Sequence, residues 1–220
     1  NFLKSLKSSA ESMAPAYEAR RSLKRFACLN CHNRDGEGGF SPELTEQMRL
    51  LENAENVDDI SPPRLTGVGH KLRTSWMLKV LTQAGRARPW MTLRMPQYGT
   101  ENVGILTEAL PKLEGTVPDD SVKPPQLTAS TIDAGRTLTG KAGHGCVACH
   151  DISGVSGGGT RGPDLALTPE RVRFDWYTRW MHQPQRLAPQ TKMPTYFPDG
   201  KSLLTSVANG DADRQIEALW

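Results

Sequence analysis

Two short stretches of the sequence decide how the whole chain folds. They are Cys28-Leu29-Asn30-Cys31-His32 and Cys146-Val147-Ala148-Cys149-His150, and they hold all four cysteines of the chain. In each stretch the two thiols are three residues apart, which places them on the same face of one helical turn. A histidine follows each pair directly. The pattern therefore indicates two copies of one chemical site.

The spacing Cys-x-x-Cys-His is the attachment motif of c-type haem. Each thiol can form a thioether to one of the two vinyl groups, and the histidine can then bind the iron from the proximal side. The sequence therefore predicts two covalently bound haems c, one on Cys28 and Cys31 and one on Cys146 and Cys149. His32 and His150 are the predicted proximal iron ligands.

Other uses of paired cysteines agree less well with the pattern. A zinc site needs four ligands, and no further cysteine exists outside the two motifs. The two pairs could form one four-cysteine site, but a histidine directly after each pair would then have no purpose. A redox disulfide needs no second copy that also ends in histidine. A secreted disulfide framework would not place every cysteine in this motif.

Length and composition narrow the class of protein further. The chain has 220 residues, of which 37% are hydrophobic and 23% charged, so it is long enough for one large globular domain or two small ones. Its net charge of +3 is spread along the chain, without the basic half that a nucleic-acid partner would require. No uncharged apolar run approaches the ~18 residues of a transmembrane helix.

Downstream of the motifs the sequence repeats itself in a register of 100 residues. The matching pairs are Pro63 and Pro163, Leu65 and Leu165, Arg73 and Arg173, Trp76 and Trp176, Gln83 and Gln183, and Arg86 and Arg186. The motifs themselves are 118 residues apart, so the first copy carries about 18 extra residues, at about 41–60. A duplication of this kind predicts two structural units, each with its own ligands.

Each copy continues into a loop with a basic residue, Met, Pro and then Tyr: Arg94-Met95-Pro96-Gln97-Tyr98 and Lys192-Met193-Pro194-Thr195-Tyr196. Together with the motifs, these loops resemble tandem di-haem class I cytochromes c. The resemblance implies an all-α fold of two tandem class I cytochrome c domains, each a small helical bundle around one haem. It also implies Met95 and Met193 as distal iron ligands, since a thioether suits low-spin haem iron. His182 is kept as the alternative to Met193.

The same resemblance places further residues around the haems. The carbonyls of Pro63 and Pro163 are expected to accept the ring N–H of the proximal histidines. Four side chains are candidates to contact the haem propionates, because arginine pairs with carboxylates and a buried indole N–H is a donor. They are Arg86, Arg186, Trp76 and Trp176. The alternatives without a role in haem binding are that the prolines only end loops and that the tryptophans only pack in the core.

The organisation expected along the chain follows from these landmarks. We expect a tail or linker at 1–11, a first domain at 12–117 with its insertion at about 41–60, a proline-rich linker at 118–129, and a second domain at 130–220. Helices are predicted over 16–26, 72–84 and 103–113, from 132, and from 168. Glycines at 36–39 and 154–159 predict flexible loops. The last helix, from 212, is expected to be truncated.

As to function, the resemblance implies an electron carrier without catalytic residues, working between a redox protein donor and a redox protein acceptor. Haem c is attached outside the bacterial cytoplasm, so the expected location is periplasmic or otherwise extracytoplasmic. The chain could also be the electron-transfer part of a larger dehydrogenase. The alternative is a di-haem peroxidase-like enzyme or a gas sensor, either of which needs one open iron site.

Overall fold

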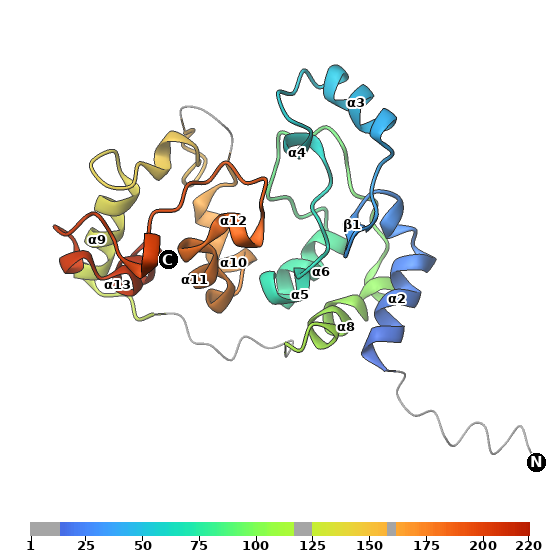
Figure 1. Ribbon diagram of the computed structural model, residues 1–220. Coiled ribbons are helices and arrows are strands. Elements are labelled where there is room, and N and C mark those ends of the chain that lie inside the picture. The colour runs from blue at the N-terminus through green and yellow to red at the C-terminus, as the bar shows by residue number, and fades with distance from the viewer. Residues whose placement is uncertain (1–13, 117–124, 158–161) are drawn as a thin grey trace, which may run out of the picture. The chain divides into compact units, whose positions relative to one another are not determined.

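The computed structural model describes residues 14–116, 125–157 and 162–220. These residues are mostly helical, and they include one two-stranded sheet (Figure 1). The helical class predicted from the sequence is therefore confirmed. The predicted tail at 1–11, most of the predicted linker at 118–129 and the end of the glycine-rich loop at 154–159 lie outside the described residues. None of the described helices is both long enough and apolar enough to cross a bilayer.

The elements of the N-terminal half begin with a helix that leads into the first motif. In chain order they are α2 (Pro15–Arg25), the 3₁₀ helix η1 (Cys28–Asn30), β1 (Asn33–Arg34), β2 (Glu37–Gly38), α3 (Pro42–Leu51), α4 (Val57–Ile60), α5 (Val68–Lys71), α6 (Thr74–Thr82), α7 (Thr100–Val103) and α8 (Leu106–Leu113). Pro15 in the first turn suits a helix start, because proline needs no N–H partner there.

The C-terminal half has a similar series of helices, and its described residues contain no counterpart of β1 and β2. Its elements are α9 (Ala129–Thr139), η2 (Cys146–Ala148), η3 (Leu165–Leu167), α10 (Thr168–Arg171), α11 (Phe174–His182), α12 (Pro184–Leu187), η4 (Pro198–Gly200), η5 (Ala208–Gly210) and α13 (Ala212–Leu219). The hydroxyl of Thr128 caps α9 and the carboxylate of Asp211 caps α13, each accepting from a backbone N–H of the first turn.

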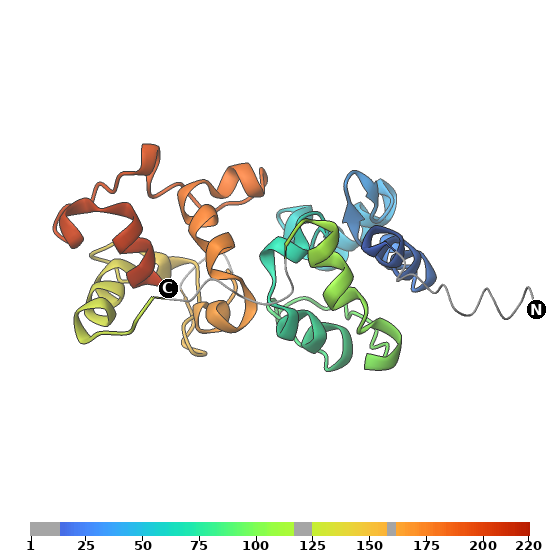
Figure 2. The ribbon, with the colours of Figure 1, turned by 90° about the horizontal axis from the view of Figure 1, so that it is seen from below.

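In each half the last helix packs on the first one. Helix α8 lies against α2, and α13 lies against α9, as Figures 1 and 2 show from two directions. The buried Ala19 and Leu23 belong to α2, and the buried Leu106 and Leu110 belong to α8. At Gly135 of α9 a Cβ atom would clash with the backbone carbonyl group of Ala218. A glycine is needed there for the two helices to approach.

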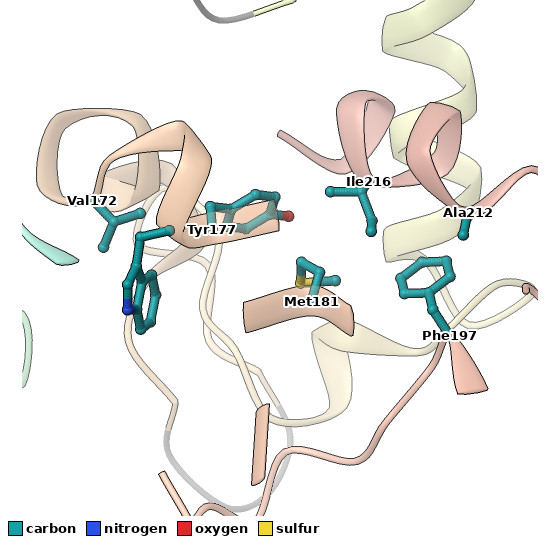
Figure 3. Packing of buried hydrophobic residues seen from close by; sticks show 7 residues of the cluster. Val172, Tyr177, Met181, Phe197, Ala212 and Ile216 are labelled. Carbon is teal, nitrogen blue, oxygen red and sulfur yellow. The ribbon is translucent and has the colours of Figure 1, made fainter. Parts of the chain in front are cut away.

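The chain divides into two compact units. Of the described residues, one unit contains 14–70, 77–84 and 92–116, and the other contains 71–76, 85–91, 125–157 and 162–220. The core of the second unit gathers around Met181 of α11, which lies between the rings of Tyr177 and Phe197 (Figure 3). Ile216 and Ala212 reach this cluster from α13. Met193 and Tyr196 of the second Met-Pro loop pack against this cluster, so the loop is joined to the hydrophobic core of the second unit.

Several predicted elements differ from the observed ones. The helix expected from Thr168 breaks into α10 and α11, because Val172 is extended (φ −111°, ψ 158°) and buries its side chain completely. The helix predicted over 72–84 is observed as the shorter α6, and the helix predicted over 103–113 is observed as α8, which begins only at Leu106. The glycines at 36–39 form a hairpin rather than a flexible loop. Its two turn residues, Asp35 and Gly36, have φ values of 53° and 87°, which a tight hairpin turn requires.

Candidate functional site

Both cysteine motifs fold into the same single turn. The backbone N–H of His32 donates to the carbonyl of Cys28 at 2.9 Å, and that of His150 donates to the carbonyl of Cys146 at 2.9 Å. The residue before each first cysteine is left-handed: Ala27 has φ 50° and Gly145 has φ 70°. The local conformation of the repeat is thus conserved within the chain, even though an alanine is less suited to it than a glycine.

The histidine rings are held in the same way in both copies. His32 Nδ1 lies 2.7 Å from the carbonyl oxygen of Pro63, and His150 Nδ1 lies 2.7 Å from that of Pro163. A carbonyl can only accept a hydrogen bond, so Nδ1 must carry the proton and donate. In the neutral ring the lone pair is then on Nε2, which is the atom that would bind a metal. The structure therefore sets both rings in the tautomer that a proximal ligand needs.

Glycines let the chain pass close to these motifs. A Cβ atom on Gly38 would lie 2.7 Å from the carbonyl oxygen of His32, and one on Gly157 would lie 2.7 Å from that of His150. A Cβ atom on Gly162 would lie 2.5 Å from Nδ1 of the His150 ring. For Gly38 and Gly157 the sequence predicted only flexible loops. Instead, these glycines provide the space in which the motif and its histidine are packed.

The tyrosine of each Met-Pro loop packs against a ring that stands just before the cysteine motif. The ring of Tyr98 packs edge-on against Phe26 with centroids 5.1 Å apart, and the ring of Tyr196 packs against His144 at 4.7 Å. Phe26 and His144 each stand two residues before the first cysteine of their motif. Burial, and next the charges of the neighbouring cysteines, raises the pKa of both Tyr98 and Tyr196. In both copies, then, the loop lies beside the cysteine pair.

The methionine backbones are anchored by glutamines that sequence reasoning missed. Gln97 donates from its amide to the carbonyl of Met95 at 3.3 Å, whereas Gln185 donates to the carbonyl of Met193 at 2.8 Å. One glutamine follows its methionine and the other precedes it by eight residues. In addition, the indole Nε1–H of Trp180 donates to the Met193 sulfur at 3.0 Å. The alternative ligand His182 instead contacts Asp213 at 3.0 Å.

The predicted propionate contacts have other partners in this structure. Arg86 donates to the backbone carbonyls of Pro89 and Met91. Arg186 donates to the side chain of Gln183 at 3.2 Å. Trp76 is buried, and the buried Trp176 stacks on Trp180 with centroids 5.1 Å apart. Arg86 thus binds the backbone of the segment that leads to Met95. That these four side chains contact the haem propionates stays a prediction.

Other features of the described residues lie apart from the two motifs. Within the described ranges, no three His, Cys, Asp or Glu side chains gather closely enough to hold a metal ion. A haem iron held by one histidine and one methionine does not need such a group. A cavity of about 360 Å³ is lined by Val147 together with parts of α9 and α13. Neither His150 nor Met193 lines it, so it is not the expected haem pocket.

The donor set of each copy fits a covalently bound haem. Each copy offers two thiols on one turn, a histidine with its lone pair on Nε2 and a methionine in the Met-Pro loop, which are the ligand types that a His/Met-ligated haem c uses. Comparisons with family models, with curated proteins and with solved structures found no match to this chain. The case for a haem site thus depends on the residues and their geometry.

Proposed function

We propose that the chain is a di-haem c-type cytochrome of the class I kind, which transfers single electrons between redox protein partners. Two covalently bound haems c would be held by the four cysteines, with His32 and Met95 on one iron and His150 and Met193 on the other. When bound, each haem supplies one-electron chemistry through its ferric and ferrous states. The proposed location is periplasmic or otherwise extracytoplasmic.

One observation carries this proposal: the same geometry occurs twice. In both copies the histidine donates to a proline carbonyl at 2.7 Å. In both copies the tyrosine of the Met-Pro loop also packs against the residue two positions before the first cysteine. The intervening sequences differ by about 18 residues in length, so chance alone would not be expected to preserve both contacts. Their repetition supports two equivalent ligand sets.

The residues of the chain would have distinct roles in this function. The cysteines hold the cofactor, and the prolines orient the histidine rings and increase their basicity through the Nδ1–H bond. Gln97 and Gln185 hold the methionine backbones, which limits how far each sulfur can move. A fixed ligand set favours electron transfer, because little has to rearrange when the iron changes its charge. The same residues would serve equally in the electron-transfer part of a larger dehydrogenase.

The test is optical spectroscopy of the full chain, produced in a host that attaches haem c. We expect two haems per chain by intact mass and a weak far-red methionine-to-iron band in the oxidised protein. We also expect no spectral shift with carbon monoxide at neutral pH. Replacing Met95 or Met193 by alanine should remove about half of the far-red band and open one iron to carbon monoxide.

Met91→Ala is the matched control, because Met91 is close to Met95 in sequence but is not followed by proline. It should leave the band and the carbon monoxide response unchanged. A chain that carries no haem in such a host would contradict the proposal. A wild-type protein in which one haem binds carbon monoxide rapidly would favour the peroxidase-like enzyme or the gas sensor instead.

A further inference from the structure

The sulfur of Met193 has a hydrogen-bond donor. The indole Nε1–H of Trp180 points to it at 3.0 Å. A thioether sulfur carries two lone pairs, so a bond to the indole leaves one lone pair for an iron. The contact therefore does not compete with the ligand role proposed for Met193.

Both partners of this contact are held in place. The Trp180 ring is stacked on Trp176 with an interplanar angle of 17°. The backbone of Met193 is held by Gln185 at its carbonyl, at 2.8 Å, and by the hydroxyl of Thr191 at its N–H, at 3.3 Å. The indole cannot turn away without losing its stacking on Trp176, and the backbone that carries the Met193 side chain is anchored at both its N–H and its carbonyl.

The first copy lacks this bond. In the register of 100 residues, Val80 stands where Trp180 stands in the second copy, and a valine side chain has no donor. Across the part of the chain that the structure describes, no hydrogen bond to the Met95 sulfur is found. The two ligand sets, which otherwise match closely, thus differ in the surroundings of the distal sulfur.

We propose that the indole N–H of Trp180 raises the reduction potential of the second haem through its bond to the Met193 sulfur. Trp180 would be a positioning residue that biases the single electron of the half-reduced protein toward the second iron. The physical reason is that the donor withdraws electron density from the sulfur. Ferric iron depends on that density more than ferrous iron does, so the bond favours the reduced state. This inference rests on the proposed function.

The test compares Trp180→Phe with wild type in the full, haem-loaded chain. Phenylalanine keeps an aromatic ring against Trp176 but cannot donate to sulfur. The two midpoint potentials are measured by spectroelectrochemical titration, and the second haem is assigned as the one whose potential falls in Met193→Ala. Trp220→Phe is the matched control, because Trp220 packs on Phe174 and Tyr177 in the same unit.

We expect Trp180→Phe to lower only the potential of the second haem, by a threefold to tenfold change in its reduction equilibrium. A tenfold change is about 59 mV for one electron. The far-red band should shift at the second haem alone, and Trp220→Phe should leave both potentials unchanged. The inference is overturned if Trp180→Phe leaves the second potential unchanged, or if Trp180→Phe and Trp220→Phe lower it equally.

Failure of the proposed function would look different from failure of this inference. In that case the wild-type chain would lack covalent haem, or its far-red band would not respond to Met193→Ala. If both haems are present and the band responds, the measured potentials decide the role of Trp180 alone.

Discussion

Gly162→Ala should loosen the proximal side of the second site, because Gly162 lies directly against the His150 ring. The new Cβ would be 2.5 Å from Nδ1 and 2.6 Å from Cε1 of that ring. Ordinary van der Waals contact with a Cβ atom begins at 3.4 Å. The ring must therefore move by roughly an ångström. The movement takes Nδ1 away from the carbonyl of Pro163, which it now reaches at 2.7 Å.

Two costs contribute to the expected loss of stability. Inserting one carbon into a packed site costs about 1–3 kcal/mol. Losing the histidine hydrogen bond costs about 1 kcal/mol more. We therefore expect Gly162→Ala to lower the free energy of unfolding of the second unit by about 2–4 kcal/mol.

Urea unfolding of the haem-loaded chain, followed by haem absorbance and circular dichroism, measures this loss. The first unit is an internal reference, since nothing near His32 is changed. Ser156→Ala, on the same loop as Gly157, should alter stability by less than about 0.5 kcal/mol. The reasoning is refuted if Gly162→Ala unfolds at the same urea concentration as wild type.

Three further predictions concern stability. Gly135→Ala should lower the free energy of unfolding by about 2 kcal/mol, because its clash with Ala218 outweighs the helix propensity of alanine; a stabilised variant in urea titration would show that α9 and α13 do not pack so closely. Arg34→Met should cost about 3–5 kcal/mol, because it leaves the buried Glu114 without the guanidinium that now lies 2.8 Å away. Adding Glu114→Leu to Arg34→Met should restore much of the loss in thermal unfolding, and no recovery would count against the ion-pair explanation. Burial lowers the pKa of His144 below its usual value. As the pH falls, His144 therefore takes up a proton in the unfolded chain before it does so in the folded chain, and the free energy of unfolding decreases below about pH 6.5. His144→Phe, which copies Phe26 of the first unit, should flatten that acid-side slope in unfolding curves measured at several pH values, and an unchanged slope would assign it to other groups.

The sequence was sufficient to foresee features that depend on spacing or on the repeat register. The one-turn fold of each motif follows from local spacing. The meeting of His32 with Pro63, and of His150 with Pro163, follows from the family resemblance and the register of the two copies. The helix that leads into the first motif was also expected at nearly its observed bounds. In each of these cases the structure is determined by residues close in sequence or can be inferred from the second copy of the pattern.

Features decided by contacts through space could not be foreseen. Val172 breaks the helix expected from Thr168 because its side chain is needed in the core. The sequence makes no prediction for Gly162, although it lies against a histidine ring. The bond from Trp180 to Met193 joins residues thirteen apart, and no pattern in the sequence indicates which way an indole points. The side chains that would contact the propionates depend on the same kind of information.

The two glutamines that anchor the methionines make the loops of the two units non-exchangeable. Gln97 lies inside its own Met-Pro loop, whereas Gln185 acts on Met193 from α12. A chimera that placed 192–196 into the first unit would remove Gln97 and find only Gly85 at the position that matches Gln185. The reverse exchange would bring two amides to one carbonyl and remove Thr195, which donates to Gln185 at 2.7 Å. A workable graft must therefore carry the whole segment from 185 to 196, because the methionine carbonyl and the glutamine that binds it lie eight residues apart in the second unit.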